Sequence, residues 1–407
     1  MGRHRALTKE AARRGVAWQP IAIAVAVVLL VLGWLGWSWV QGSLDRRAAA
    51  LVGTCAEGPA GLRVAVTPST AEPVRLAAGR WNQRDTIVHD HCVEVQVVVI
   101  PPEQVLEGLT GQWSEGVLGQ RPQAWLPDST FWVNKLAAWN NAAISSAPES
   151  VASSPVVLAL PEEAAAALNE GNSFSWGDLA GLTSAPHGWT RYGKPEWGRF
   201  GVAVPDPDTN PASSLALQCA LAGASPSRSG PVTTEMLATP EIRKYLAQLA
   251  GSKPSQVPAT TQESLITLAE PSSVTGAPYT AVPVIEVDLY RRNLAADGKP
   301  RAPQTLFEVA ARGPSPAADF PLVGLADGGT DGTHIRAAQK FREFLKEPEQ
   351  QRDFNEAGLG ASGGAAYPSD AEGIRWDSAT TSFQPADAKT AAQIAAAWAS
   401  AADGGRR

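Results

Sequence analysis

Short β-branched runs alternate with segments of helical spacing along this chain, and that alternation most narrows the folds it can adopt. Residues 62–67 (LRVAVT) predict a strand that ends at Pro68, and apolar positions between Glu72 and Trp81 recur at helical intervals. A strand that leads through Ser/Thr residues into a helix opens an α/β domain, so we predict a mainly parallel sheet with helices on both faces. The next predicted elements are strands at 93–100 and 124–127 and helices at 103–120 and 130–139.

The alternation continues through a chain of 407 residues, which exceeds one ordinary hydrophobic core. We therefore expect two domains, or one domain built as two lobes. Further predicted strands lie at 155–160, 200–204, 281–287 and 320–324. Further predicted helices lie at 162–168, 212–221, 239–249, 262–268, 334–345, 348–357 and 387–402.

The N-terminal part contains an almost uncharged stretch from Trp18 to Val40, with three tryptophans near its C-terminal end. About 20 such residues cross the hydrocarbon core of a bilayer as a helix, and indole rings favour its interface. Because positive residues precede the span, we expect a retained signal anchor of the cell membrane, single-pass, with a cytoplasmic N-terminus and an extracytoplasmic body. A cleaved signal peptide is the alternative, but it would have a shorter apolar core and a nearer cleavage site than Ala48–Ala50.

Charge and motifs argue against several function classes. Residues 1–47 carry a formal charge of +5 and the remainder −11, whereas nucleic-acid binding needs clustered Lys and Arg. Residues 360–364 (GASGG) match G-x-S-x-G, but a predicted helix precedes them, which favours a helix end and turn over a nucleophile elbow. Adjacent residues in a loop, such as 89–92 (HDHC), seldom point at one metal ion, and no second His/Cys cluster in the sequence completes a tetrahedral site. We therefore expect no catalytic residues, no metal and no cofactor.

The three cysteines predict one disulfide and one spare thiol. Cys55 and Cys92 flank the first strand–helix unit on the oxidising side of the membrane, so a bridge between them would close this loop. Cys219 lies among apolar residues of a predicted helix, where we expect a buried, inert thiol.

Polar residues gather where predicted strands lead into helices. They are Ser69, Thr70, Asp128, Ser129, Asn210, Ser213 and Ser214. Free backbone N–H groups and the helix dipole meet at such junctions, and ligands of open parallel sheets bind at the carboxyl ends of strands. Helix capping alone explains each position taken singly. Their repetition after successive strands favours a binding cleft.

Seven stretches within residues 60–365 also carry a family resemblance. They are LRVAVTPSTAEPVRLAAGRWNQ (62–83), CVEVQVVVIPPEQV (92–105), AWLPDSTFWVNKL (124–136), SSPVVLALP (153–161), GVAVPDPDTNPASSLAL (201–217), YTAVPVIEVDLYRRN (279–293) and AAQKFREFLKEPEQQRDFNEAGLG (337–360). In order and spacing they resemble the bacterial extracytoplasmic solute-binding proteins of the type 2 periplasmic-binding fold. The chain looks closest to actinobacterial membrane-anchored members, through its N-terminal helix, early Cys pair and WLPDS segment (125–129). Many of those carry a von Willebrand A domain, whose Asp-x-Ser-x-Ser motif is absent here.

The resemblance implies an α/β, bilobed type 2 periplasmic-binding-like fold with two parallel-sheet lobes and two crossovers, preceded by one transmembrane helix. Ligand in the cleft between the lobes would close them by hinge motion. The implied parts are a cytoplasmic N-terminus (1–17), a signal anchor (18–40), a linker (41–59), lobe I (60–155 and 283–378), lobe II (156–282) and an Ala-rich tail helix (379–407). The residues implied to face the cleft are Ser69, Thr70, Asp128, Ser129, Ser153, Ser154, Asn210, Ser213, Ser214, Tyr279 and Glu286.

The expected function is therefore a membrane-anchored solute-binding-like protein that captures a small polar ligand without catalysis. Its expected partners are that solute, an ABC permease or another envelope protein, and the membrane through the N-terminal helix. The alternative is a non-transport envelope scaffold built on the same fold. In that alternative the tail helix, with Ala391, Ala395, Trp398 and Ala402 on adjacent turns, would dock a partner, although packing on its own body is the favoured arrangement.

Overall fold

The computed structural model describes residues 55–170, 174–271, 273–326, 330–360, 367–369, 371–376 and 381–404. The chain divides into a first unit, Met1–Gly58, and a second, Pro59–Arg407. The predicted signal anchor at 18–40 lies outside the described residues, as do residues 361–364 of the G-x-S-x-G match. Within the described part of the chain, no helix combines the length and the apolar character that a bilayer crossing requires.

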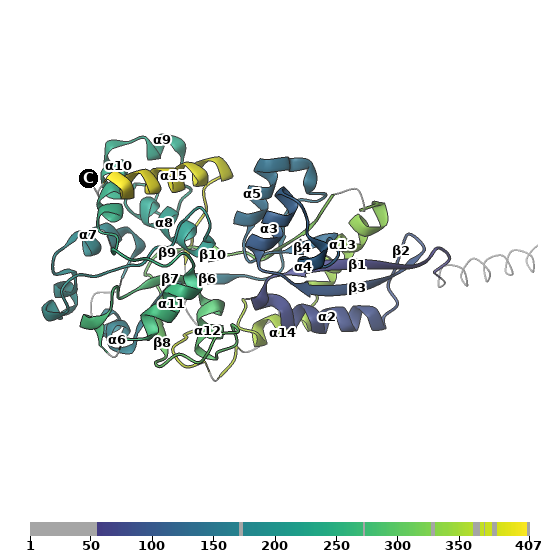
Figure 1. The fold of residues 1–407 in the computed structure, drawn as a ribbon, viewed down its shortest axis with the longest axis horizontal. Coiled ribbons are helices and arrows are strands. Elements are labelled where there is room, and N and C mark those ends of the chain that lie inside the picture. Colours follow the sequence, from purple (N-terminus) through teal and green to yellow (C-terminus); the bar gives the residue numbers. More distant parts are fainter. Residues whose placement is uncertain are drawn as a thin grey trace, which may run out of the picture. The chain divides into compact units, whose positions relative to one another are not determined.

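The first sheet is built around β1 (Gly58–Val66), which pairs in parallel with β4 (Ala124–Leu126). Its strand order is β2-β3-β1-β4-β11-β5 (Figure 1). The β11 strand is antiparallel to both of its neighbours, so this sheet is mixed. The other strands are β2 (Ile87–Val88), β3 (His91–Val99), β5 (Glu149–Ser150) and β11 (Pro321–Gly324).

Side chains of β1 alternate between two cores, as a strand buried on both faces requires. Leu62, Val64 and Val66 join one core, in which Trp81 of α2 packs edge-on against Phe341 of α13. Ala65 joins the other, with residues of α3 and α5. The helices around this sheet are α2 (Ala71–Gln83), α3 (Pro102–Thr110), α4 (Glu115–Leu118), α5 (Thr130–Asn140), α13 (Gly332–Leu345) and α14 (Pro348–Glu356).

The second sheet is centred on β6 (Ser154–Pro161), which is buried along most of its length. The strands β7 (Val282–Ile285), β8 (Leu306–Val309) and β10 (Ala317–Ala318) all pair with β6, each of them antiparallel. The prediction of a parallel sheet here was therefore wrong. Since β6 carries the chain away from the first sheet and the later strands carry it back, they run in opposite directions.

Two predicted strands differ from the structure in this region. Residues 200–204 form no regular strand; Val202 makes a single parallel bridge to Ala281. The strand expected at 281–287 ends at Ile285, because Glu286 already begins α12. The β8 and β10 strands fall in the segment that the resemblance assigned to lobe I, yet they pair with the first strand of predicted lobe II. The division into lobes stays a prediction.

Helices after β6 include α8 (Pro211–Gly223), which is buried along nearly its whole length, including the polar residues Ser213, Ser214 and Gln218. The others are α6 (Glu162–Glu170), α7 (Leu179–Ser184), α9 (Thr234–Leu237), α10 (Pro240–Gly251), α11 (Thr261–Ala269), α12 (Glu286–Asn293) and α15 (Ala388–Gly404). Short 3-10 turns include η1 (Pro68–Thr70), which leads from β1 into α2.

The tail helix α15 packs on its own body. Ile394 and Trp398 are 2% and 3% exposed, and the helix contacts α5, α8, α9 and α10. Figure 1 shows it in yellow beside α9 and α10. The Thr234 hydroxyl of α9 donates to Gln393 Oε1 at 3.0 Å. The β12 strand (Thr381–Ser382) leads into the helix and pairs in parallel with β9 (Pro314–Ser315).

Candidate ligand cavity

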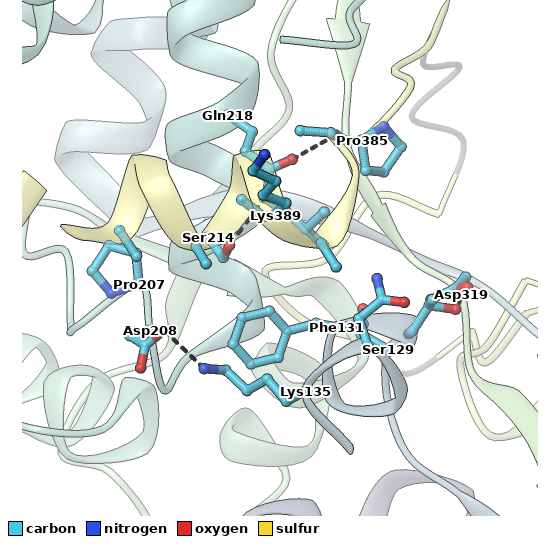
Figure 2. Close-up of a pocket in the computed structure, with 18 of the residues that line it drawn as sticks. Ser129, Phe131, Lys135, Pro207, Asp208, Ser214, Gln218, Asp319, Pro385 and Lys389 are labelled. Carbon is cyan, nitrogen blue, oxygen red and sulfur yellow. Dashed lines mark hydrogen bonds and ion pairs between the residues drawn. The ribbon is translucent and has the colours of Figure 1, made fainter. Parts of the chain in front are cut away.

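A cavity of about 1140 Å³ lies where α5, α8 and α15 come together. Figure 2 shows Ser214 and Gln218 on one side of it and Ser129, Phe131 and Lys135 on the other. Its volume slightly exceeds the usual range for small-molecule sites, roughly 300–1,000 Å³. Two of the predicted site residues, Ser129 and Ser214, line it.

The α5 side of the cavity is fixed by helix capping. Ser129 Oγ accepts from the Phe131 N–H at 3.2 Å, and the Asp319 carboxylate accepts from the Thr130 N–H at 2.7 Å and from the Thr130 hydroxyl. These bonds satisfy backbone donors that the start of a helix otherwise leaves free. Asp319 comes from the chain just after β10, so it ties α5 to the second sheet.

The α8 side of the cavity holds a buried chain of hydrogen bonds. Gln218 Nε2 donates to Ser214 Oγ at 3.1 Å, and Gln218 Oε1 accepts from the Ala386 N–H at 2.8 Å. The Gln218 amide thus connects a predicted binding hydroxyl to the backbone just before α15. Ser213, one residue earlier, is completely buried, and its hydroxyl has no hydrogen-bond partner among the described residues.

One ion pair lies in the cavity lining. Lys135 Nζ on α5 lies 2.8 Å from Asp208 Oδ1, in the segment that precedes α8. The ammonium also lies 5.2 Å from the centre of the Phe131 ring. Because both charged groups are partly exposed, the pair contributes little to stability, about 0–1 kcal/mol. The ion pair keeps the Lys135 ammonium and the Asp208 carboxylate facing each other.

The tail supplies another side of the cavity. Nine of the residues that line it come from β12, α15 and the turn between them. They are Ser382, Phe383, Pro385, Ala386, Ala388, Lys389, Ala391, Ala392 and Ala395. Sequence reasoning did not include any of them among the site residues, because alanines of an Ala-rich helix carry no chemical signal of a ligand.

Two acidic groups outside the cavity lining have raised pKa values. Burial, with added repulsion from Asp288, raises the pKa of Asp128 well above its ordinary value, although Trp132 Nε1 donates to its Oδ1 at 2.8 Å. Burial likewise raises the pKa of Asp288 on α12 to about 6, with Arg291 opposing the shift and Asp297 adding to it. The described residues contain no group of three His, Cys, Asp or Glu side chains arranged to hold a metal ion.

The other predicted site residues lie away from the cavity lining. Thr70 is completely buried and its hydroxyl donates to the Thr67 carbonyl at 3.2 Å, next to a 3% exposed Ser69. Asn210 caps no backbone N–H but donates from Nδ2 to the Asp206 carbonyl at 3.0 Å. Ser153 is exposed and exchanges backbone bonds of 2.8 and 2.7 Å with Gly360.

Three further predicted site residues lie at the start of β6, just before β7 and at the start of α12. Ser154 Oγ accepts from the Val287 N–H at 3.1 Å, which caps the start of α12. Glu286 begins that helix and is 4% exposed. Tyr279 is 1% exposed, and its hydroxyl donates to the Ser264 carbonyl at 2.9 Å in a separate core cluster. These contacts give the three residues structural roles, and their roles as ligand-binding residues stay predictions.

The cysteines follow the sequence prediction. Cys55 and Cys92 are both disulfide-bonded, and Cys219 is free and 1% exposed. Burial raises the pKa of the Cys219 thiol to about 12, and the thiol lies 3.3 Å from the Pro314 carbonyl oxygen. Such a thiol is protonated and unreactive at neutral pH.

Comparison with known proteins places these features in a family. Residues 62–360 match the bacterial extracellular solute-binding proteins. Two uncharacterized proteins of Mycobacterium tuberculosis, from two strains, are each 30% identical over 350 residues, which cover 86% of this chain and 50% of theirs. The chain therefore spans about half the length of these curated relatives.

Solved structures share the fold at low sequence identity. A periplasmic thiamin binding protein is 12% identical with a TM-score of 0.52, covering 84% of this chain and 96% of that one. The apo ferric ion-binding protein A of Pasteurella haemolytica is 12% identical with a TM-score of 0.51, covering 85% and 98%. An ABC transporter protein of Clostridium perfringens is 10% identical with a TM-score of 0.52, covering 84% and 98%. The predicted periplasmic-binding-like α/β fold is thereby confirmed.

Proposed function

The chain belongs to the bacterial extracellular solute-binding protein family, and we propose that it captures a small solute in the cavity between α5, α8 and α15. The observation that carries this proposal is the cavity itself, which places Ser129 and Ser214 on opposite sides of a space large enough for a ligand. Hydroxyl and amide groups on its sides would hold the polar part of the solute. The proposed role is binding without catalysis.

We extend the proposal to transport and to the membrane. A protein of an ABC transporter shares the fold, and this supports delivery of the solute to an ABC permease. The apolar stretch 18–40 supports a signal anchor that keeps the body outside the membrane, close to such a permease. The scaffold alternative has less support, because the Trp398 face it would use for docking is packed against the body.

The experiment is a thermal-shift screen of the full chain against oxyanions, sugars, amino acids and organic cations. A ligand present at 100 times its dissociation constant stabilises the folded state by about 2.7 kcal/mol, so the melting temperature should rise by a few degrees. A broad panel in which no compound raises the melting temperature would contradict the proposal.

The matched variants are Ser214→Ala in the cavity and Ser400→Ala on the exposed side of α15. Removing the Ser214 hydroxyl takes away one hydrogen-bonding group, and we expect the affinity for the ligand found to fall roughly 2–10-fold. Ser400 bonds only to the Ala396 carbonyl of its own helix, so its variant should bind as the parent does. Equal affinities of the two variants would remove Ser214 from the site.

A further inference from the structure

The helix α15 has two adjoining faces, one packed on the body and one that lines the cavity. One face, with Thr390, Ile394 and Trp398, is buried against the body of the protein. The other consists of Ala388, Ala391, Ala392 and Ala395, at the i, i+3, i+4 and i+7 spacing of one helical stripe, and lines the cavity. Lys389 lines the cavity beside this stripe, and Ala388 and Ala392 are exposed, so methyl groups form most but not all of the α15 surface at the cavity.

Apolar side chains from other elements face the same space. Leu106 of α3 and Phe131 of α5 line one part of the cavity, and Leu215 of α8 another. Phe383, just before α15, is 5% exposed and lines it as well. More than half of the residues around the cavity are apolar, so water in it lacks hydrogen-bond partners over most of its surface.

The charges around the cavity are mostly engaged by other protein groups. Lys135 is paired with Asp208, and Asp319 accepts two hydrogen bonds from Thr130. Lys389 is the remaining charged residue of the lining and is exposed to solvent. Most polar side chains of the lining come from α5 and its N-cap (Ser129, Thr130, Asn134) and from α8 (Ser214, Gln218), while Thr110, Ser315 and Ser382 lie on other elements. A ligand that fits this distribution has a polar end and a longer apolar part.

We infer that the solute carries an alkyl or acyl chain, which lies along the alanine stripe of α15 while its polar end meets α5 and α8. This inference rests on the proposed solute-binding function and narrows its ligand class. It makes the tail, rather than the strand-to-helix junctions alone, the element that determines specificity. The four alanines act by shape: their small side chains leave the space that the chain of the ligand occupies.

The test uses the full chain in lipid nanodiscs, with empty nanodiscs as the blank for partitioning. Straight-chain carboxylates from butanoate to decanoate and the matching alkyltrimethylammonium ions are titrated, and the dissociation constants are measured by calorimetry. Each buried methylene should tighten binding about fourfold, for at least one of the two head groups, until the cavity is filled. Affinity that does not change with chain length would overturn the inference.

Two matched variants locate the effect on α15. Ala392→Phe fills the cavity from the alanine stripe and should weaken binding of the longest carboxylate or ammonium probe at least tenfold. Ala396→Phe adds the same ring at an exposed position outside the lining and should leave that binding unchanged. Circular dichroism verifies that both variants are folded. If Ala392→Phe does not fold, Ala392→Leu takes its place, because its side chain fills the cavity less. Equal loss in the position 392 and position 396 variants would overturn the assignment to α15.

The outcomes also separate this inference from the function on which it rests. If a polar solute of the thermal-shift panel binds and none of the alkyl probes does, the solute-binding function stands and the apolar ligand class is wrong. If neither the polar panel nor the alkyl probes bind, both are wrong. If the alkyl probes bind with the expected dependence on chain length and on residue 392, both are supported.

Discussion

At the scale of single residues, buried polar groups hold the cavity in place. The Gln218 side chain joins α8 to the segment before α15, and the Asp319 carboxylate joins α5 to the chain after β10. The Gln218 amide is 3% exposed, so leaving it without its partners costs about 1–3 kcal/mol, whereas the Asp319 carboxylate is only partly buried. Asp128 and Asp288 differ from these, because burial disfavours their charged forms.

Stability should therefore depend on the protonation of Asp288. Its pKa is about 6 in the folded protein and near 3.8 when the chain is unfolded, so the folded state binds the proton more tightly. The protonated carboxyl favours folding below pH 3.8, and this advantage is lost as the pH rises to 6. Asp288→Asn should stabilise the protein at pH 7 by on the order of 1–3 kcal/mol and flatten its stability between pH 4 and 6.

Urea unfolding at pH 4, 5, 6 and 7 measures this effect. Glu107→Gln is the matched control, since Glu107 is an exposed carboxylate on α3 and should leave the pH profile as it is. A profile of Asp288→Asn that parallels the parent at all four pH values would show that burial does not perturb this carboxyl.

At the scale of elements, α15 is the helix whose part in the cavity could least be predicted from the sequence. It contacts α5, α8, α9 and α10, and the Trp398 side chain is 3% exposed among them. A helix rich in alanine has little area to bury at each position, so a single large residue carries much of its attachment. The tail is therefore held at few points.

Trp398→Ala should loosen α15 and destabilise the protein by about 3–5 kcal/mol, because the change removes a buried ring and leaves a cavity. Limited proteolysis should then cut the tail earlier than in the parent, and the melting temperature should fall. Trp139→Ala is the control: Trp139 is 56% exposed on α5, and its variant should stay within about 0.5 kcal/mol of the parent. Equal effects of the two variants would show that Trp398 is not an anchor.

Many of the elements could be predicted from the sequence, for reasons visible in particular segments. Residues 62–67 and 155–160 are rich in β-branched and apolar residues, and their burial in the sheets follows from that pattern. Strand direction did not follow, because the apolar run of β6 looks the same whether its neighbours are parallel or antiparallel. Ser129 and Ser214, which line the cavity, were predicted from their positions where strands lead into helices, whereas the alanines of α15 face the cavity only because of how the helix docks.

At the scale of the whole molecule, the family assignment and the fold agree, and the described residues place a ligand-sized cavity among α5, α8 and α15. The sequence adds a proposed anchor at 18–40 and a strong charge difference between residues 1–47 and the rest of the chain. In the proposed topology the acidic body lies outside the membrane, and an oxidising environment there would maintain the disulfide bonding of Cys55 and Cys92.

The proposed topology is tested in cells that carry a C-terminal epitope on the full chain. The protein should sediment with membranes, and protease added to spheroplasts should remove the epitope while a cytoplasmic marker survives. Replacing Leu29, Leu30 and Leu32 by charged residues should abolish membrane insertion. The control is Glu57→Lys, at an exposed position outside the apolar stretch, which should leave insertion unchanged. An epitope that survives the protease in intact spheroplasts and is lost only after lysis would reverse the topology.

The contacts of α15 have a mechanical consequence. The helix touches α5 on one side of the cavity and α8 on the other. Any rigid-body motion that widens the distance between α5 and α8 must therefore slide the tail off one of them, or carry it along and expose its alanine stripe. The energy of opening then depends on the contacts of a helix that begins 165 residues after α8 ends. The contacts of α15 with α5 and α8 would therefore oppose any such separation.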